Sequence, residues 1–458
     1  MGKGQGKIHF IGISGSGMSG IATIMIQQGF QVSGSDLNQN AAASRLINMG
    51  AEVSWGHDST NVGHDTDIVV ISTAIGADNP ELVAAREKGI EIVRRGQMLA
   101  RLMADKKGIA VAGAHGKTTT SSMIALVFEK NVLDPTVVVG GDVVELGGNA
   151  KLGQGDYMVA EADESDGSFL LLAPTIEVIT NIEDDHLDYY GSREAIKEAF
   201  VEFMQKTPED GFVVVCADDP NVRELIADTN KTIITYGIMH QSTYMAQNIR
   251  TEGLHTYSDI YYGLELLGQL ELNVPGLHNI NNAMAAIAVG RVAGLGFDGI
   301  ARALKDFRGV HRRFELLGNV QGINVVDDYA HHPTEVKATL RAAKQTKANR
   351  VIGVFQPHRF TRTKFLFREF GESFSDSDVI VINEIYGAGE IPLEGVTAEL
   401  IVNAIKDNEN KPVYYFKTIG EVTDFLSETA EEGDLILTMG AGNIRSAGIH
   451  LVERLKAR

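Results

Sequence analysis

The 458-residue sequence contains a single cysteine, Cys216, so the chain cannot form an internal disulfide. A lone cysteine is typical of proteins from reducing compartments. Because Cys216 lies in the apolar run 212–217, FVVVCA, we interpret it as an inert thiol of the hydrophobic core.

Long hydrophobic runs are also missing. No apolar run approaches the roughly 20 residues that a membrane-spanning helix needs. The N-terminus, MGKGQGKIHF, lacks the apolar segment of a signal peptide. Gly6 does not fit the myristoylation pattern either. We therefore expect a cytoplasmic protein that has no membrane among its partners.

Positive charge is scarce. The chain has 41 Lys and Arg against 60 Asp and Glu, and its formal net charge is -19. This balance argues against nucleic acid or a membrane surface as a partner of the chain as a whole. It still allows local basic pockets for small anions. The length predicts about three domains of roughly 150 residues each.

The most informative stretch is 108–120, GIAVAGAHGKTTT. A buried strand is expected at its start, Gly113 and Gly116 allow a tight turn, and Lys117 opens a helical run. Such a turn presents backbone N–H groups and a helix N-terminus to a phosphate, with the lysine on the terminal phosphates and a threonine on magnesium. The full GxxxxGK[ST] pattern requires glycine where this sequence has Val111. An ordinary strand–turn–helix junction is therefore the alternative interpretation.

A second glycine-rich turn lies near the N-terminus. The run 7–11 predicts a strand, and it leads into GISGSGMSG, in which Gly15, Gly17 and Gly20 match G-x-G-x-x-G. Asp36 ends the next predicted strand, where a Rossmann fold places the acid that binds a ribose hydroxyl. The context predicts a nucleotide-type diphosphate at a helix N-terminus and does not identify the nucleotide. A glycine-rich packing turn is the alternative.

Two acidic segments each follow an apolar run. After 157–160 come Glu161, Asp163, Glu164 and Asp166, and after 176–180 come Glu183, Asp184, Asp185, His186 and Asp188. The carboxyl ends of parallel strands meet at one edge of a sheet. Oxygen ligands favour Mg²⁺, which commonly shares its ligand shell with nucleotide phosphates. We prefer a magnesium site to two solvated acidic loops.

Amide and guanidinium groups gather towards the end of the middle third. Asn279 and Asn282 are three residues apart on a predicted helix, so one face presents both amides. Capping accounts for one of them but does not require both. Shortly afterwards, Arg308, Arg312 and Arg313 form a local basic patch. These arginines either bind phosphate through forked hydrogen bonds or belong to a solvated linker.

The last third repeats strand–helix units, which predicts a second doubly wound sheet and an α/β fold. One strand runs into Asp328, Tyr329, His331 and His332, and another runs into His358, Arg359 and Arg362. The adjacent histidines do not form the i, i+4 pair of HExxH, and thiolate ligands are missing. We therefore disfavour a zinc hydrolase.

Together these motifs resemble the Mur ligases of bacterial peptidoglycan synthesis. GISGSGMSG, GAHGKTTT, EADESDGSF, TNIEDDHLD, GLHNINNAMAA, HRRFE, DDYAHHPTE and PHRFTRT follow one another over nearly the whole chain. The resemblance implies three domains: a Rossmann-like UDP-sugar-binding domain at 1–106, a central P-loop ATPase domain with a parallel sheet at 107–312, and a Rossmann-like C-terminal domain at 313–458. The third would bind the amino acid and complete the ATP site.

The resemblance also implies a reaction. L-alanine would be joined to the carboxylate of UDP-N-acetylmuramate through an acyl phosphate, with ATP and Mg²⁺ as cofactors. The expected partners are the two substrates, and the expected assembly is a monomer or a homodimer. Several Mur ligases carry a carbamylated lysine near the metals. No clear equivalent follows TNIEDDHLD, because Lys197 lies in a helical run, and this fits the alanine-adding branch.

Individual residues receive roles from the resemblance alone. ATP would be bound by Gly113, Ala114, His115, Gly116, Lys117, Thr118, Thr119, Asn279, Asn282, Arg313 and Asp328. The sugar nucleotide and amino acid would be bound by Gly15, Ser16, Gly17, Met18, Asp36, Ser72, Thr73, His115, Tyr329, His331, His332, His358, Arg359 and Arg362. Magnesium would be held by Thr118, Glu161 and His186, with Glu164 as the alternative to Glu161. Catalysis would rest on Lys117, His186 and Arg313.

Three other functions compete with this hypothesis. An NAD-linked oxidoreductase fits GSGMSG and Asp36 but leaves GKTTT and the acidic strand ends unexplained. A nucleotide-dependent switch would bind ATP without forming an amide. A related recycling ligase would join a preformed tripeptide to the same sugar nucleotide. HRRFE and PHRFTRT favour the alanine-adding reaction, and substrate trials would separate the two ligases.

Overall fold

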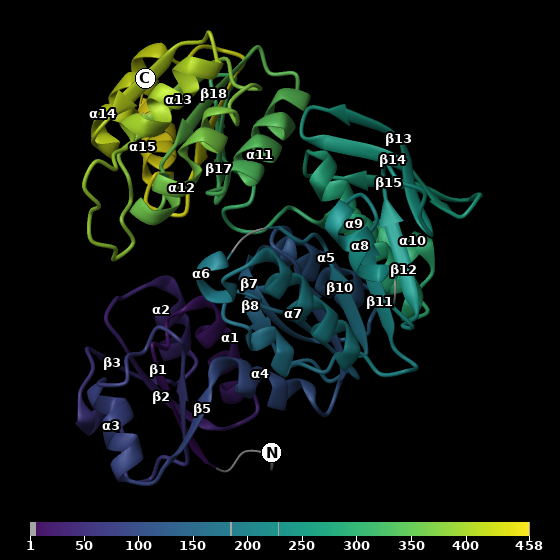
Figure 1. Cartoon of the computed structure of the whole chain (residues 1–458), viewed down its shortest axis with the longest axis vertical. Coiled ribbons are helices and arrows are strands. Elements are labelled where there is room, and N and C mark those ends of the chain that lie inside the picture. Colours follow the sequence, from purple (N-terminus) through teal and green to yellow (C-terminus); the bar gives the residue numbers. More distant parts are fainter. Residues whose placement is uncertain (1–5, 184–185, 228, 458) are drawn as a thin grey trace. The chain divides into compact units, whose positions relative to one another are not determined.

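The computed structural model describes residues 6–183, 186–227 and 229–457 (Figure 1). The chain divides into two compact units. Unit 1 comprises Met1–Gln247, Asp259–Gln269 and Asn281–Lys305. Unit 2 comprises Asn248–Ser258, Leu270–Ile280 and Asp306–Arg458.

An N-terminal parallel sheet opens unit 1, with the strand order β3-β2-β1-β4-β5. Its strands are β1 (Lys7–Ile11), β2 (Gln31–Asp36), β3 (Glu52–Trp55), β4 (Ile68–Ile71) and β5 (Glu91–Arg94), and its helices are α1 (Ser16–Gln27), α2 (Ala41–Asn48), α3 (Pro80–Glu87) and α4 (Arg95–Met103). The strand order reverses at β1, which lies between β2 and β4. Doubly wound sheets bind ligands outside the carboxyl ends of the strands at such a reversal. The predicted strands at 7–11 and before Asp36 are confirmed.

The central sheet has ten strands in the order β15-β14-β13-β12-β11-β10-β6-β9-β7-β8. The strands are β6 (Lys107–Ala112), β7 (Thr136–Val143), β8 (Gly148–Lys151), β9 (Tyr157–Glu161), β10 (Ile176–Ile179), β11 (Phe212–Cys216), β12 (Ile233–Gly237), β13 (Tyr244–Glu252), β14 (His255–Tyr262) and β15 (Glu265–Leu272). From β12 to β7 neighbouring strands are parallel, and β8 pairs with β7 antiparallel. Two residues each join β13 to β14 and β14 to β15, which is too short for a parallel crossover, so this edge is antiparallel.

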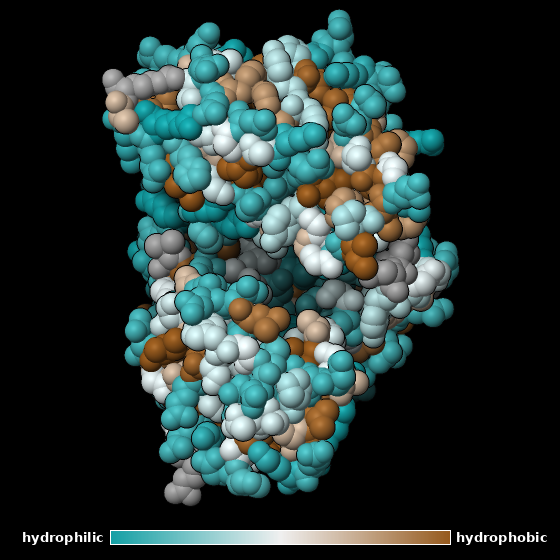
Figure 2. All heavy atoms as spheres, turned by 90° about the vertical axis from the view of Figure 1, so that its left-hand side faces the viewer, coloured by the Kyte–Doolittle hydropathy of each residue, from teal (hydrophilic) through white to brown (hydrophobic). Residues whose placement is uncertain are grey.

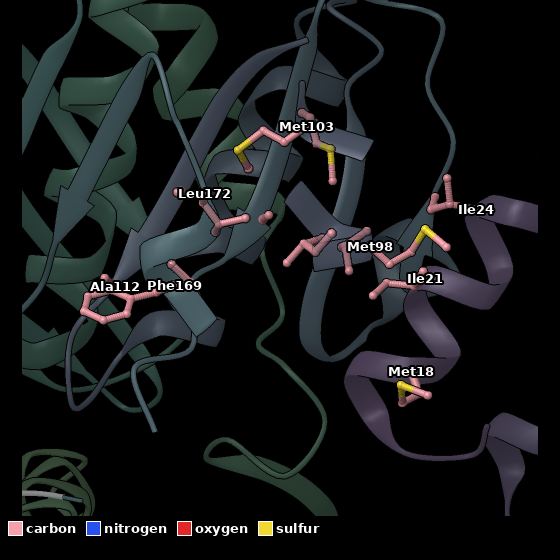
Figure 3. Packing of buried hydrophobic residues seen from close by; sticks show 14 of the residues in the cluster. Met18, Ile21, Ile24, Met98, Met103, Ala112, Phe169 and Leu172 are labelled. Atoms are coloured by element: carbon pink, nitrogen blue, oxygen red, sulfur yellow. The ribbon is translucent and has the colours of Figure 1, made fainter. Parts of the chain in front are cut away.

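Helices and a shared core complete unit 1. The remaining helices of the central part are α5 (Lys117–Lys130), α6 (Leu187–Tyr190), α7 (Arg193–Lys206), α8 (Pro220–Ile226), α9 (Leu277–Val292) and α10 (Phe297–Asp306). Helices α9 and α10 each contain residues of both units. One apolar cluster continues from the N-terminal sheet into the central sheet. In Figure 3, α1 contributes Met18, Ile21 and Ile24 to this cluster, and α4 contributes Met98 and Met103. The two sheets are therefore held together by buried apolar contacts.

Unit 2 contains a six-stranded sheet in the order β16-β17-β21-β18-β19-β20. Its strands are β16 (Glu315–Val320), β17 (Ile323–Asp328), β18 (Arg350–Phe355), β19 (Val379–Asn383), β20 (Val413–Phe416) and β21 (Asp434–Met439), and its helices are α11 (Pro333–Gln345), α12 (Phe360–Gly371), α13 (Glu399–Asn408), α14 (Ile419–Thr429) and α15 (Arg445–Ala457). Val325 and Val326 are neighbours on β17 but belong to different apolar clusters, so both faces of the sheet are covered. This confirms the predicted doubly wound sheet. The antiparallel edge strand β16 was not predicted, because its sequence ELLGNV has little β-type alternation.

Hydrophilic side chains cover most of the face shown in Figure 2, and apolar side chains are scattered among them. Among the helices of the described residues, none combines the length and the apolar character that a membrane crossing requires.

The carboxyl group of Glu177 is buried in the central sheet. Glu177 of β10 has no exposed surface, and its Oε2 accepts a hydrogen bond of 2.9 Å from Thr207 Oγ1. Its Oε1 has no hydrogen-bond partner in the described part of the chain. Burial raises the pKa of Glu177 from 4.5 to about 8. The side chain is therefore protonated in the folded protein at neutral pH.

This burial predicts a specific pH dependence of stability. Because the pKa is raised on folding, the contribution of protonated Glu177 is complete below pH 4.5 and is lost as the pH rises through about 8. The Glu177→Gln protein carries a neutral side chain of the same shape, so its stability does not change with pH through this position. We expect the stability difference between Glu177→Gln and the unmodified protein to grow between these pH values, by about 1.4 kcal/mol per pH unit at the steepest. Urea unfolding at several pH values measures this, and a pH-independent difference would contradict the assignment.

Candidate functional site

The glycine turn between β6 and α5 is held by two side chains that directly follow the neighbouring strand β10. Thr180 Oγ1 donates to the carbonyl oxygen of His115 at 2.7 Å. Asn181 accepts from the backbone N–H of His115 at 2.8 Å and donates to its carbonyl oxygen at 2.9 Å. Because β10 lies beside β6 in the sheet, Thr180 and Asn181 emerge directly next to the turn. Hydrogen bonds within the protein therefore hold the shape of the turn.

Val111, where the sequence departs from the usual phosphate-loop pattern, belongs to strand β6. Val111 is fully buried in β6 and pairs with Glu161 on one side and Val178 on the other. A glycine there would weaken the strand. The turn begins only at Gly113, and Thr180 and Asn181 provide the bracing.

Both glycines of the turn have backbone conformations that disfavour a side chain. Gly113 has φ +129°, and a Cβ atom there would lie 2.2 Å from Thr180 Oγ1. Gly116 has φ +82°, and a Cβ atom there would lie 2.7 Å from Asn282 Oδ1. Asn282 also accepts a hydrogen bond of 3.1 Å from Thr120 Oγ1. The structure thus brings Asn282 to the turn, although the two are far apart in sequence.

Lys117, the first residue of α5, lies among oxygen atoms. Its Nζ donates to the carbonyl oxygen of Gly113 at 2.6 Å and to Glu164 Oε1 at 2.8 Å. Burial alone lowers the pKa of Lys117, but the carboxylates of Glu164 and Glu161 outweigh burial and hold it above its ordinary value. The structure therefore keeps a positive charge at the glycine turn.

The acidic strand ends meet Lys117 and the following threonine. Thr118 Oγ1 donates to Glu161 Oε2 at 2.9 Å, and the backbone N–H of Gly140 donates to the same oxygen at 2.8 Å. His186 Nε2 lies 3.6 Å from Glu164 Oε1. Both glutamates thus belong to the site, and Asp184 and Asp185 lie outside the described residues.

This donor set fits a magnesium ion. Glu164 Oε2 is buried and has no hydrogen-bond partner among the residues that the structure describes. Carboxylate and hydroxyl oxygens of Glu161, Glu164 and Thr118 are the ligand type that Mg²⁺ prefers. An unsatisfied buried carboxylate oxygen is costly, and a cation would remove that cost.

The N-terminal glycine turn follows β1, and Asp36 at the end of β2 braces it. Asp36 Oδ2 accepts from the backbone N–H of Ser14 at 3.0 Å, and Oδ1 accepts from the N–H of Asn38 at 3.1 Å. Burial alone raises the pKa of Asp36, but these hydrogen bonds outweigh burial and lower it. Gly15 caps α1 without a side-chain hydrogen bond. Asp36 thus orients the turn in addition to any contact with ribose.

The other predicted residues of this turn lie at the same sheet edge. Ser16, Gly17 and Met18 form the first turn of α1. Ser72 and Thr73 directly follow β4, which pairs with β1 in register Ile11 to Ile71. The carboxyl ends of β1 and β4 thus bring these residues to one edge.

A second group of predicted residues gathers in unit 2, around Tyr329. The guanidinium carbons of Arg312 and Arg313 lie 4.9 and 5.4 Å from the centre of the Tyr329 ring. Arg313 Nη1 donates to Glu335 Oε1 at 3.4 Å. Glu335 Oε2 accepts from the backbone N–H groups of His331 and His332. Glu335 therefore positions both histidines at the start of α11.

The imidazole ring of His331 in this group lies near that of His358, which stands just before α12. The ring centres of His331 and His358 are 5.8 Å apart, and His358 stacks on Tyr386 at 5.9 Å with an interplanar angle of 11°. Arg362 Nη1 lies 3.4 Å from His358 Nδ1. Burial, with the neighbouring His331, lowers the pKa of His358 to about 4. His358 is therefore neutral at physiological pH.

Arg359 is held in an unusual conformation by a loop that is distant in sequence. Its φ is +72°, and its N–H donates to the carbonyl oxygen of Tyr386 at 2.9 Å. Glu390 caps α12 by accepting from the N–H and the hydroxyl of Thr361 at 3.0 and 2.6 Å. Strained backbone of this kind clusters at functional sites. No motif in the sequence predicted that Tyr386 and Glu390 would contact this segment.

Asp328 and Asn279 are the remaining predicted residues of unit 2. Asp328 is buried and accepts from the backbone N–H groups of Phe314 and Ala330 at 2.8 and 2.7 Å. Burial raises its pKa to about 6, although Arg313 opposes this. Asn279 donates to the carbonyl oxygen of Pro275 at 2.7 Å, near the start of α9.

Comparison with known proteins identifies the family. Residues 7–107 match the description "Mur ligase family, catalytic domain", residues 111–290 match "Mur ligase middle domain", and residues 312–442 match "Mur ligase, glutamate ligase domain". The chain belongs to the Mur ligase family. Mur ligases are ATP-dependent ligases, so this chain uses ATP.

Individual relatives cover nearly the whole Mur ligase chain. The UDP-N-acetylmuramate–L-alanine ligase of Pelotomaculum thermopropionicum is 59% identical over 450 residues, which cover 98% of this chain and 97% of the relative. The enzyme of the same name from Desulforamulus reducens is 54% identical over 454 residues, which cover 99% of this chain and 98% of the relative.

Solved structures agree with the family assignment. The UDP-N-acetylmuramate–alanine ligase of Thermotoga maritima has a TM-score of 0.85 and 31% identity, covering 99% of this chain and 100% of that chain. A murein peptide ligase from Psychrobacter arcticus has a TM-score of 0.72 and 25% identity, and the match covers 98% of this chain and 99% of that chain. The three-domain α/β architecture of the Mur ligases is thus confirmed. The N-terminal and central domains share one compact unit because they share an apolar core.

The glycine turn can be tested with a pair of alanine substitutions. Gly113→Ala places a Cβ atom against Thr180 and Asn181, so we expect at least about a tenfold loss of affinity for a non-hydrolysable ATP analogue. Gly50→Ala is the matched control, because Gly50 has φ +101° and no atom within 4 Å of the added Cβ. The control should lower stability by about 1 kcal/mol without changing nucleotide binding. Calorimetric titration measures both, and equal nucleotide affinities would refute the role of Gly113.

Proposed function

We propose that this protein joins the amino group of L-alanine to the carboxylate of UDP-N-acetylmuramate, converting ATP to ADP and phosphate, in peptidoglycan synthesis. The observation that carries the proposal is the near-complete coverage of relatives of that name at up to 59% identity. The Lys117 turn with its bracing residues and two glutamates provides the matching chemistry in this chain.

The chemistry requires activation of a carboxylate, because oxide is a poor leaving group. Transfer of the γ-phosphoryl group of ATP to a carboxylate oxygen gives an acyl phosphate and ADP. The alanine amine then attacks the acyl carbon, and the carbon–oxygen bond to phosphate breaks as the amine loses a proton. Two anions meet in the first step, so Lys117 and Arg313 are assigned to neutralise their charge.

Magnesium is part of this proposal. Thr118, Glu161 and His186 would hold it, and Glu164 is the alternative to Glu161. Mg²⁺ supplies charge neutralisation at the phosphate oxygens. The unpartnered buried oxygen of Glu164 supports a cation at this place.

The other assignments follow the resemblance. ATP is assigned to the turn from Gly113 to Thr119 with Asn279, Asn282, Arg313 and Asp328. The sugar nucleotide is assigned to Gly15, Ser16, Gly17, Met18, Asp36, Ser72, Thr73 and His115. The muramoyl carboxylate and alanine are assigned to Tyr329, His331, His332, His358, Arg359 and Arg362. The neutral imidazole of His358 leaves the two arginines as the cations for a carboxylate.

Three further properties belong to the proposal. The domains are placed at 1–106, 107–312 and 313–458. The protein is assigned to the cytoplasm, where the lone buried Cys216 stays reduced. Its assembly is a monomer or a homodimer.

Replacement of the loop lysine tests the phosphate site. Lys117→Ala should abolish phosphate release, because it removes the ammonium group that lies between the carbonyl oxygen of Gly113 and Glu164 Oε1. UDP-N-acetylmuramate should still bind. Lys107→Ala is the control, since Lys107 is an exposed residue at the start of β6. Near-normal turnover of Lys117→Ala would overturn the assignment.

A substrate panel tests the reaction itself. Phosphate release would be measured with ATP, Mg²⁺ and UDP-N-acetylmuramate in the presence of L-alanine, glycine, L-serine or the tripeptide of the recycling reaction. We expect the largest kcat/KM with L-alanine. Preference for the tripeptide would identify the recycling ligase. Phosphate release that does not depend on the sugar nucleotide would contradict both.

A further inference from the structure

Arg95 is a basic residue that neither the motifs nor the comparisons assign to a site. It is the first residue of α4 and directly follows β5. β5 pairs with β4 in the register Ile71 to Arg94, so Arg95 leaves the sheet at the edge that holds Ser72 and the N-terminal glycine turn. The fold therefore brings this cation to the carboxyl edge of the N-terminal sheet.

The Arg95 side chain lies directly over Gly17. A Cβ atom on Gly17 would be 3.0 Å from Arg95 Cδ and 3.1 Å from Nη1. Any larger residue at this position would displace the guanidinium group. Gly17 is thus needed for the approach of Arg95 to the first turn of α1, as well as for the turn itself.

The opposite side of the guanidinium group is anchored on the central sheet. Nη2 donates to Asp163 Oδ2 at 2.9 Å and to Ser168 Oγ at 3.2 Å, and it lies 3.5 Å from Asp166 Oδ2. The neighbouring Gly96 permits this contact, because a Cβ atom there would lie 2.6 Å from Ser168 Cβ. Because Gly17 and Gly96 have no side chains, Arg95 has room between the N-terminal turn and the acidic segment after β9.

The anchoring leaves the N–H groups of Nη1, on the side of Gly17, available. All hydrogen bonds of Arg95 to described residues come from Nη2. Nε and Nη1 are the nitrogen atoms nearest to Gly17. The first turn of α1 contains no acidic residue and has no side-chain cap, so its dipole also favours an anion. The N–H groups of Nη1 beside a helix N-terminus are suited to charge-assisted hydrogen bonds with phosphate oxygens.

We propose that Arg95 contacts the diphosphate of the sugar nucleotide through Nη1 while Nη2 remains on Asp163. This inference rests on the proposed function, because the ligand of the N-terminal turn is the sugar nucleotide. Asp163 and Asp166 both lie beside Nη2, and their negative charge opposes an anion. Asp163 also holds the guanidinium group in one orientation, which reduces the ordering cost of binding. Arg95 is thus a binding residue that spans the sugar-nucleotide turn and the acidic segment of the ATP site.

The test compares two arginine substitutions. Arg95→Met removes the guanidinium group and its charge, and we expect UDP and UDP-N-acetylmuramate to bind about 10- to 100-fold more weakly. The loss should be smaller for UMP, which has one phosphate. Arg95→Lys keeps the charge but has a single nitrogen atom in place of Nη1 and Nη2, and it should give an intermediate loss. Affinity for the ATP analogue should not change. Calorimetric titration measures each value.

Arg45→Met is the matched control. Arg45 of α2 also joins the N-terminal sheet to the central sheet, through a two-pronged pair with Asp142 at 2.7 and 2.8 Å. If Arg95 served only to pack the two sheets, Arg45→Met and Arg95→Met would weaken UDP binding equally, and this would overturn the inference. Unchanged UDP affinity in both Arg95 variants would also overturn it. Failure of the unmodified protein to bind UDP-N-acetylmuramate would instead contradict the proposed function.

Discussion

The site depends on hydrogen bonds between neighbouring strands of the central sheet. Thr180 and Asn181 follow β10 and fix the backbone of His115, so the turn before α5 has one shape. Because β10 and β9 flank β6, the same edge receives the bracing amide and the carboxylate of Glu161. Parallel pairing of three strands thus places a turn, its support and its acidic groups together.

Charge in unit 1 is organised by one acidic segment. Glu161 and Glu164 face Thr118 and Lys117, whereas Asp163 and Asp166 face Arg95. Strand β9 ends at Glu161, and the irregular backbone after it points these side chains in different directions, so a short segment serves two cations. Buried carboxylates of this kind are tolerable only when cations or hydrogen bonds oppose them. The ATP turn and the sugar-nucleotide turn therefore share a common acidic neighbour.

Much of the fold was predictable because it follows from local patterns. Apolar runs marked β1, β6, β9, β10 and the strands of the C-terminal sheet, and glycines marked the two turns. The weak pattern of β16 and the bracing role of Asn181 were not predictable. Asn181 stands in TNIEDDHLD, where the acidic residues are the stronger signal. Arg95 was missed because its partners are 68 or more residues away in the chain.

The sequence by itself determined the class of the chain: an α/β protein with two glycine turns, acidic strand ends and the motifs of the Mur ligases. Those features depend on residue type and spacing along the chain. Only the tertiary structure decided that Val111 belongs to β6, that Asn282 reaches Gly116, and that Gly17 makes room for Arg95. These facts depend on strand order and on which side chains meet across the sheet edge, and local spacing carries no information about either.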